Sequence, residues 1–251
     1  MARYDFRTPR LFVEAALAPG ARVPLDRAQA NYLFNVLRRK AGDLVLVFNG
    51  RDGEWHALLE PAGRKDFALV AQERTRPQPE PGNLHYLFAP LKHARLDYMM
   101  QKAVEMGAAR LQPVLTRHGQ VERVNLARMR ANAIEAAEQC GILSLPEITE
   151  PAALAAVIAA FEPARLLVFC DEDAEVKDPV AALAALRLDG EGAPSLAVLI
   201  GPEGGFYDDE RAALMKVPKV VRLSLGPRIL RADTAAVAAL ALVGAVLGYW
   251  R

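Results

Sequence analysis

The chain has 251 residues, of which 52% are hydrophobic and 24% are charged, and its net charge is +1 at pH 7. This composition excludes an intrinsically disordered chain, which combines low hydrophobicity with high net charge, and a protein that binds polyanions through its overall charge. The length is typical of one large domain or of two domains of unequal size.

The first part of the chain has the pattern of a small β-rich domain. Asp26 is a suitable N-cap for a short helix over residues 26–40, in which apolar side chains recur at helical spacing. Strands are expected at residues 44–48, 54–59 and 67–71, and the Asn and Gly residues between the first two favour a hairpin turn. Several short strands in a small domain indicate a compact β-barrel.

Three prolines at alternate positions follow this region, in the stretch Arg76-Pro-Gln-Pro-Glu-Pro-Gly82. Proline lacks a backbone N–H and favours extended backbone, so the stretch predicts a short stiff linker. We therefore expect two domains, at residues 1–76 and 83–251, joined by a linker at 77–82.

The second part alternates apolar runs with helical patterns, which predicts a parallel sheet covered by helices on both faces. The expected strands lie at residues 84–89, 111–115, 166–170, 196–200 and 220–225. The expected helices cover 94–106 with Gly107 as C-cap, 125–139 with Asn125 as N-cap, a segment from Thr149, a segment from Asp178, and 232–248. The uncharged stretch 235–250 is shorter than the roughly 20 residues that span a membrane, so we expect a buried helix and no membrane partner.

Three loops follow the apolar strands at the edge where parallel sheets bind ligands. They are Cys170–Asp173, Gly201–Phe206 and Gly226–Thr234. The glycines and the proline of the middle loop let a ligand approach the backbone closely. The loop is neither a P-loop nor a GxGxxG fingerprint, which weighs against a nucleoside triphosphate or NAD. On the residues alone, a plain strand-to-helix turn is equally compatible with it.

Two arginines, Arg228 and Arg231, flank a pair of apolar residues in the third loop. One interpretation is backbone contact to a small ligand together with an arginine directed at a phosphate. The other is a solvated surface loop. Thr234 lies near the start of the last helix, where a hydroxyl either caps the helix or binds a ligand.

With these loops, the sequence resembles the RsmE family of SPOUT-class RNA methyltransferases. The matching stretches follow the family's order: residues 7–12, 36–39, 101–107, 135–141, 199–206 and 225–235. The combination of Gly-Pro-Glu-Gly-Gly (201–205) with Leu-Gly-Pro-Arg-Ile-Leu-Arg (225–231) carries the resemblance. Two positions depart from the family pattern: Ile142 stands in place of an arginine and Asp233 in place of a glutamate.

The resemblance implies an α/β fold, with a SPOUT-type trefoil-knotted parallel-sheet domain and a small N-terminal PUA-like β-barrel that binds RNA. It implies S-adenosyl-L-methionine as cofactor, N3 of a specific uridine in 16S rRNA as methyl acceptor, and that rRNA or the assembled small ribosomal subunit as partner. It also implies a homodimer, formed with the apolar last helix. Two alternatives stay open: a SPOUT enzyme that methylates a ribose 2′-hydroxyl, and a catalytically silent RNA-binding factor.

The three loops, together with the resemblance, indicate where the cofactor binds. The expected cofactor-binding residues are Cys170, Asp171, Glu172, Ile200, Gly201, Pro202, Glu203, Gly204, Gly205, Leu225, Gly226, Arg228, Ile229, Leu230 and Thr234.

Arg231, followed by Arg228, is the first candidate for a catalytic role. Loss of the N3 proton leaves negative charge on the uracil carbonyl oxygens, which a guanidinium stabilises; the same side chains could instead hold the target phosphate. Glu203 and Asp233 are the carboxylates in suitable loops to accept the proton, and Glu203 is also a candidate catalytic residue. Glu203 is equally compatible with capping the following helix.

Basic residues gather near the N-terminus, where the first 40 residues hold eight basic and three acidic side chains. Because phosphate contacts dominate affinity for nucleic acids, we expect RNA binding there, and a solvated basic face is the alternative. The expected RNA-binding residues are Arg7, Arg10, Arg38, Arg39 and, in the second part, Lys92.

The two cysteines, Cys140 and Cys170, are too few for a disulfide framework and lack the spacing of a zinc site. The four histidines show no ligand spacing either, so no metal is expected. The sequence start has no secretory signal pattern, and we expect a cytoplasmic location.

Overall fold

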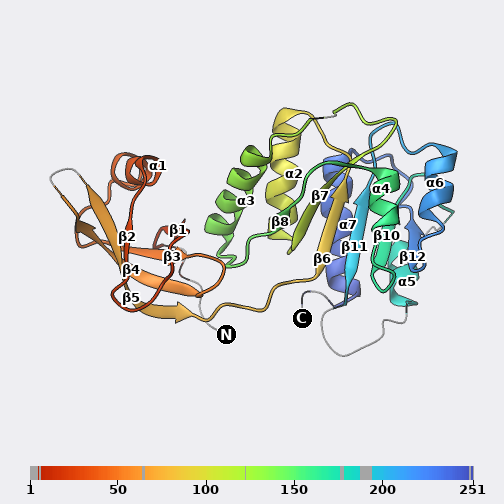
Figure 1. Ribbon diagram of the computed structural model, residues 1–251. Helices are drawn as coiled ribbons and strands as arrows, with labels where there is room; N and C mark the ends of the chain where they lie inside the picture. The colour runs from red at the N-terminus through yellow and green to blue at the C-terminus, as the bar shows by residue number, and fades with distance from the viewer. Residues whose placement is uncertain are drawn as a thin grey trace. The chain divides into compact units, whose positions relative to one another are not determined.

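The computed structural model describes residues 5, 7–63, 66–121, 123–175, 178–186, 194–248 and 250. Contacts divide the chain into two compact units (Figure 1). Unit 1 comprises residues 1–81 and 134–145, and unit 2 comprises residues 82–133 and 146–251. Unit 1 is therefore discontinuous, since it includes a short stretch that lies far along the chain.

A five-stranded mixed sheet forms the centre of unit 1. Its strands, in spatial order, are β1 (Arg10–Phe12), β3 (Leu44–Phe48), β4 (Glu54–Pro61), β5 (Phe67–Arg76) and β2 (Arg22–Pro24). β1 and β3 are parallel and the other neighbours are antiparallel. Inward-facing residues such as Leu33, Val47 and Leu59 are fully buried and form one apolar core. The three predicted strands are confirmed, and β5 runs on to Arg76.

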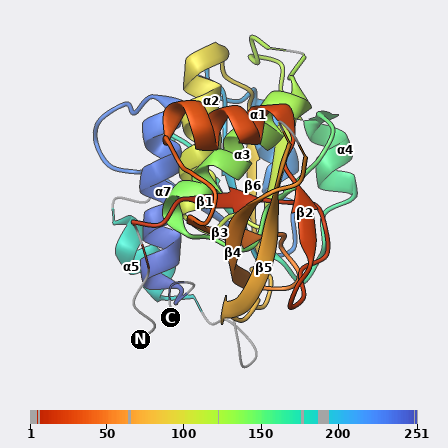
Figure 2. The ribbon, with the colours of Figure 1, turned by 90° about the vertical axis from the view of Figure 1, so that its left-hand side faces the viewer.

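The predicted N-terminal helix is confirmed at its start and wrong at its end. Asp26 caps α1 (Arg27–Asn31): its side chain accepts a 2.8 Å hydrogen bond from the Gln29 backbone N–H, and the Gln29 side chain accepts from the Asp26 N–H. The chain then widens into a π-helix over Tyr32–Val36, which buries Leu33 completely, and Arg38 adopts a φ of 54°. Helical periodicity in the sequence did not reveal this change of helix type. Figure 2 shows α1 across one end of the sheet.

A buried ion cluster joins the strands of unit 1. The Glu54 carboxylate accepts hydrogen bonds from Arg10 Nε at 2.7 Å and from Arg76 Nε and Nη2 at 2.9 and 2.6 Å. Burial alone would raise the pKa of Glu54, but the hydrogen bonds from Arg76 and Arg10 outweigh it and hold the pKa at about 2. The same guanidinium groups donate to the carbonyl oxygens of Glu138 and Gly141, at 3.1 and 3.0 Å. These bonds tie residues 134–145 to the rest of the unit.

A parallel sheet forms the centre of unit 2, and the predicted strands are confirmed to within one or two residues. The strand order is β12 (Val220–Leu223), β10 (Leu166–Cys170), β11 (Leu196–Ile200), β6 (Leu84–Phe88), β7 (Arg110–Leu115) and β8 (Glu147–Ile148), with β9 (Ala152–Ala153) also paired to β7. All these pairs are parallel. Both faces are buried, because Phe169 and Leu199 join one apolar cluster while Tyr86 donates to Met99 Sδ on the other face.

Helices cover both faces of this sheet. They are α2 (His93–Glu105), α4 (Leu154–Ala159), α5 (Pro179–Ala184), α6 (Asp208–Leu214) and α7 (Ala232–Val246). Another helix, α3 (Leu126–Cys140), begins in unit 2 and ends in the residues that belong to unit 1. α2 packs on α7, and α4 packs on α6 (Figure 1). The predicted caps are confirmed: Asn125 accepts from the Arg128 N–H and Asp178 from the Ala181 N–H, both at 3.0 Å, and Gly107 follows α2 with a φ of 88°.

The helix predicted to begin at Thr149 is wrong. The backbone N–H of Thr149 donates to Leu111 at 3.1 Å, and Ala152 and Ala153 pair with the end of β7. The segment is therefore held as extended backbone at the sheet edge, and α4 begins only at Leu154. Pairing with a strand distant in sequence overrides the local helix-start pattern.

Within the described part of the chain, no helix is long and apolar enough to cross a membrane.

Candidate active site

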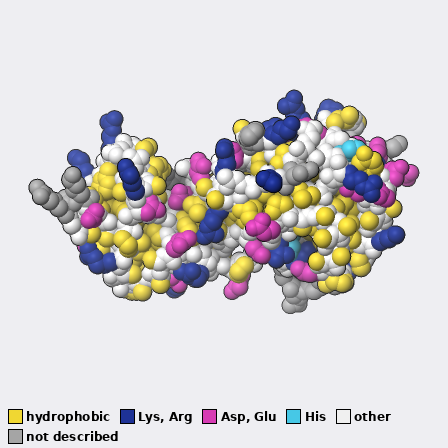
Figure 3. Space-filling view, turned by 45° about the horizontal axis from the view of Figure 1, so that its top comes forward, with side chains coloured by type: hydrophobic (Ala, Val, Ile, Leu, Met, Phe, Trp, Pro, Cys, Tyr) yellow, Lys and Arg dark blue, Asp and Glu magenta, His cyan; other side chains and the backbone are white. Residues whose placement is uncertain are grey.

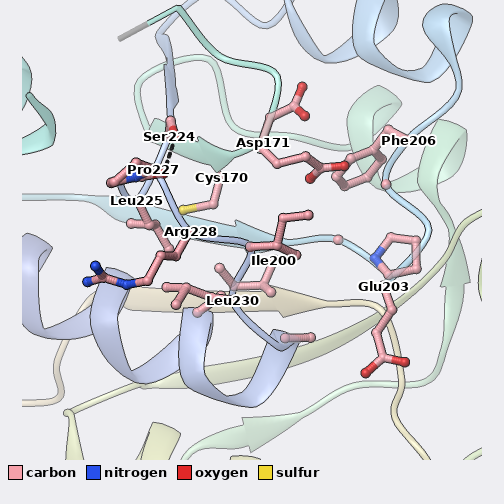
Figure 4. A pocket seen from close by; sticks show the side chains of 18 residues that line it. Cys170, Asp171, Ile200, Glu203, Phe206, Ser224, Leu225, Pro227, Arg228 and Leu230 are labelled. Carbon is pink, nitrogen blue, oxygen red and sulfur yellow. Dashed lines mark hydrogen bonds between the residues drawn. The ribbon is translucent and has the colours of Figure 1, made fainter. Parts of the chain in front are cut away.

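The strand order brings the three predicted loops together. β12, β10 and β11 are parallel neighbours, so the loops that follow them leave the same edge of the sheet. They enclose a cavity of about 220 Å³ (Figure 4). All the residues predicted to bind a cofactor line it except Gly204 and Thr234. Residues that the sequence did not single out also line it: Phe206, Ser224, Pro227, Ala232 and Ala235.

Asp171 fixes the position of the loop after β10. Its side chain is fully buried and accepts from Arg211 Nε of α6 and Arg222 Nε of β12, both at 2.9 Å. Burial by itself would raise the pKa of Asp171, but these arginines lower it, so the carboxylate stays ionised. Asp171 therefore holds the cavity walls in place, although it also lines the cavity.

The shape of the loop after β11 depends on small residues. A Cβ on Gly201 would lie 2.3 Å from Cε2 of Phe206, whose ring is buried and packs edge-on against Phe169. Gly205 has a φ of 69°, which L side chains rarely adopt. These two positions explain why the turn after the apolar strand is rich in glycine.

Gly204 and Thr234 lie outside the cavity lining. A Cβ on Gly204 would be 3.3 Å from Cβ and Cγ of His118, so this residue faces the loop after β7. Thr234 is exposed in the first turn of α7. Of the expected cofactor-binding residues, these two therefore do not contribute to the cavity wall.

One arginine joins the two carboxylates that the sequence offered as proton acceptors. Arg95 of α2 donates to Glu203, and it donates to Asp233 through Nη2 at 3.0 Å and Nε at 3.3 Å. The Arg95 hydrogen bonds are the main cause that lowers the pKa of Asp233. In Figure 4 the Glu203 side chain points away from the other labelled side chains, consistent with its bond to Arg95. No local motif indicated this link, because the three residues are far apart in sequence.

A second, smaller cavity of about 60 Å³ lies on the other side of Glu203. Pro202 and Glu203 line both cavities. Its other lining residues come from the loop after β6 and the start of α2, and from the loop after β7: Pro90, Leu91, Lys92, Arg95, His118, Gln120 and Val121. The two cavities therefore share the loop after β11, the strand that lies between β10 and β6.

Comparison with known proteins identifies the family. A family model described as "RNA methyltransferase domain" matches residues 78–244, and one described as "RNA methyltransferase PUA domain" matches residues 25–72. The chain belongs to the RNA methyltransferase family. Its SPOUT-type α/β fold and PUA-like N-terminal part agree with the expectation from the sequence.

Relatives named ribosomal RNA small subunit methyltransferase E match nearly the whole chain. The protein from Synechocystis is 30% identical over 95% of this chain and 78% of its own length. The protein from Rickettsia conorii is 27% identical over 93% of this chain and 94% of its own length. A methyltransferase structure from Legionella pneumophila, in complex with the bound cofactor SAM, is 29% identical over 95% of this chain and 98% of that chain, with a TM-score of 0.80.

The two arginines of the last loop of this methyltransferase are both exposed. Arg228 lines the larger cavity, and Arg231 is the N-cap residue of α7. Within the described part of the chain, neither side chain has a hydrogen bond or an ion pair. The Cys170 thiol lies at the cavity floor, where burial and the charge of Asp171 raise its pKa to about 12, so it remains protonated.

The predicted RNA-binding residues have different environments. Arg7, Arg38 and Lys92 are exposed, whereas Arg39 is half-buried, with an enclosed Nε that lacks a partner among the described residues. The Arg10 side chain is only 3% exposed and is bound to Glu54, so it has no surface to offer to a phosphate. On the face of unit 1 drawn in Figure 3, basic side chains are scattered and form no continuous patch.

Proposed function

We propose that this protein uses S-adenosyl-L-methionine to methylate N3 of a uridine in the 16S rRNA of the small ribosomal subunit. The observation that carries the proposal is the cavity formed by the loops after β10, β11 and β12, in a chain that belongs to the RNA methyltransferase family. The resemblance of the loop sequences to the RsmE family supplies the choice of the base atom over the ribose hydroxyl.

The chemistry of the larger cavity fits this cofactor. Ile200, Leu225, Leu230 and Ala235 offer apolar surface suited to an adenine ring, and glycine-rich turns expose backbone groups that can bind its polar edge. The partly exposed carboxylate of Glu172 suits the cationic amino group of the methionine part. When bound, S-adenosylmethionine supplies a methyl group on a positively charged sulfur, which makes its carbon open to attack.

The residues of the chain have to remove the N3 proton and stabilise the charge that remains. A neutral imide nitrogen is a poor nucleophile, so the proton must leave before or during the transfer. Glu203 is a suitable acceptor because it lines both cavities. Asp233 is a poorer one, because it lines neither cavity.

We assign the exposed arginines to RNA contact. Arg228 and Arg231 lie at the rim of the site and are suited to phosphates beside the target nucleotide. Arg7 and Arg38 are suited to the same role in unit 1. Arg10 is left out of this set because it is buried.

The proposal includes a cytoplasmic location and a homodimer. The outer side of α7, with Val237 and Leu242, is apolar and only partly buried, and it carries no charge from residue 235 onward. Such a surface supports pairing with a second copy of the chain. Light scattering that finds only monomers would exclude the dimer.

Mapping of methylated nucleosides in 16S rRNA tests the proposed reaction. Cells that lack the protein should lose one N3-methyluridine, and the unmodified gene should restore it. The Ala235→Leu variant should not restore it, because leucine keeps the helix but fills the cofactor cavity. The matched Ala184→Leu change, at an exposed position of α5, should restore it. Loss of a ribose methyl group instead would favour the 2′-hydroxyl alternative, and an unchanged methylation pattern would favour a silent RNA-binding factor.

A further inference from the structure

The position of the smaller cavity is set by the sheet. The larger cavity lies above β12, β10 and β11, and the smaller one lies above β11, β6 and β7. Methyl transfer needs the acceptor atom about 3–3.5 Å from the methyl carbon, so the acceptor base has to bind next to the cofactor. The smaller cavity meets this requirement, because it shares Pro202 and Glu203 with the larger one.

The polar groups of the smaller cavity are mainly donors. Lys92, Arg95, His118 and Glu203 are its titratable or charged side chains, and Gln120 adds an amide. Lys92, His118, Gln120 and Glu203 are exposed, so the cavity is open to an incoming base. Donors suit the two carbonyl oxygens that flank N3 of uracil and disfavour the amino group of cytosine.

Among these titratable or charged side chains, Lys92 is the one whose donors are all free within the described part of the chain. Arg95 already donates through Nε, Nη1 and Nη2 to Asp233 and Glu203. Within the described part of the chain, the Lys92 ammonium group has no hydrogen bond and no ion pair. A lysine ammonium is a compact charge with three rotatable donors, which can follow a carbonyl oxygen as its charge grows.

We propose that the smaller cavity binds the Watson–Crick edge of the target uracil, and that Lys92 stabilises the negative charge that develops on a uracil carbonyl oxygen. The inference rests on the proposed function and replaces Arg231 by Lys92 in that role. The N3–H bond breaks and its proton passes to Glu203. The N3 electron pair forms the bond to the methyl carbon, and the pair of the broken carbon–sulfur bond stays on the sulfur. Glu203, which is 45% exposed, then returns the proton to water.

Single-turnover methylation of small ribosomal subunits that lack the modification, measured between about pH 7.5 and 9.5, tests the role of Lys92. In the Lys92→Gln variant, we expect the rate at pH 7.5 to fall about tenfold and the apparent pKa of the rising limb to move up by about one unit. The rates of the two proteins should converge as the pH rises, because hydroxide then removes the N3 proton without help.

Three controls separate the possible roles. Lys92→Arg keeps the charge and should restore most of the profile. Lys216→Gln removes an exposed lysine in the turn after α6 and should leave the profile unchanged. The affinity of each variant for the subunit is measured at several salt concentrations. A Lys92→Gln variant that binds more weakly with a smaller salt slope, but keeps the pH profile, would make Lys92 a phosphate contact and overturn the proposal. If the unmodified protein forms no N3-methyluridine on these subunits, the proposed function itself fails.

Discussion

A cluster of charged side chains in unit 1 has two arginines and one carboxylate, whereas a cluster in unit 2 has one arginine and two carboxylates. In unit 1, Glu54 lies between Arg10 and Arg76, and the Arg10 and Glu54 side chains are only 3% and 4% exposed. In unit 2, Arg95 lies between Glu203 and Asp233, and the Arg95 and Glu203 side chains are 32% and 45% exposed. The first cluster satisfies buried charges inside a fold, whereas the second connects two loops at the edge of a cavity.

Burial decides what each cluster can do. A charge enclosed in the protein cannot lose its partner without a large penalty, so the Glu54 cluster is fixed. A partly exposed pair gains little free energy, because water competes with it, so the Arg95 bridge can exchange partners when a substrate arrives. The comparison shows that the role of an arginine depends on the carboxylate with which it pairs. That carboxylate is distant in sequence, so composition alone does not reveal the role.

The largest expected effect is on the buried cluster. Glu54→Gln leaves two guanidinium groups without their counter-charge, and we expect the free energy of unfolding to fall by about 3–5 kcal/mol. Chemical denaturation at pH 7 measures this change. The matched control is Glu60→Gln, which removes an exposed partner of Arg22 and should cost less than about 1 kcal/mol.

The same cluster predicts a dependence of stability on pH. The pKa of Glu54 is about 2 in the folded chain against an ordinary value of 4.5 for a glutamate in an unfolded chain, so its contribution is present above pH 4.5 and is lost as the pH falls toward 2. The stability difference between the unmodified protein and Glu54→Gln should therefore shrink across this range. A difference that stays constant down to pH 2 would contradict the ionised cluster.

The Arg95 bridge should affect turnover more than stability. Arg95→Gln releases Glu203 and Asp233, and we expect the methylation rate to fall about tenfold while the free energy of unfolding changes by less than about 1 kcal/mol. Arg95→Lys should restore the rate only in part, because an ammonium cannot reproduce the planar donor set. Arg128→Gln, which removes an exposed pair with Asp97, is the control. A large loss of stability in Arg95→Gln would show that this bridge stabilises the fold, as the Glu54 cluster does, and would contradict the prediction.

The smallest effect concerns Glu138, a partly buried carboxyl that forms no ion pair among the described residues. Burial raises the pKa of Glu138 to about 7, although its carboxylate accepts a 2.8 Å hydrogen bond from the Phe12 N–H. A raised pKa means that folding favours the protonated form, so this contribution is complete below pH 4.5 and is lost as the pH rises to about 7. Glu138→Gln should therefore raise stability by about 1 kcal/mol at pH 8 and leave it nearly unchanged at pH 4.5. Thermal unfolding at both pH values measures this change. A Glu138→Gln variant that is less stable than the unmodified protein at pH 8 would contradict the interpretation.

Sequence patterns predicted the parts of the fold that short-range physics controls. The apolar runs 44–48, 166–170 and 196–200 are strands with the same bounds in the structure, because each is buried and ends at turn-forming residues. The Thr149 segment misled because its start resembles a helix N-terminus, and only pairing with β7 decides its backbone. The π-helix at Tyr32–Val36 likewise has no period that distinguishes it from an α-helix in the sequence.

The site followed the same division. Three loops after apolar strands were predictable as cavity walls, but the order β12, β10, β11 that brings them together was not derivable from spacing. Gly204 faces His118, which lies in the loop after β7, and this contact between two loops is not visible in the sequence. The charge count near the N-terminus could not distinguish Arg10, which reaches Glu54, from Arg7, which reaches solvent.

Because unit 1 is formed from two separate stretches of the chain, it cannot fold completely until the second stretch has been synthesised. Arg10 and Arg76 need the carbonyl groups of Glu138 and Gly141, which are made only after the whole stretch 82–133. At about 5–20 residues per second, synthesis from residue 82 to Gly141 takes roughly 3–12 s, and the N-terminal sheet is incomplete during that time. During that interval two guanidinium groups lack their final acceptors, and the nascent unit is open to chaperones. A fragment that ends at residue 81 would lack these acceptors permanently. A separate peptide of residues 134–145 would supply them.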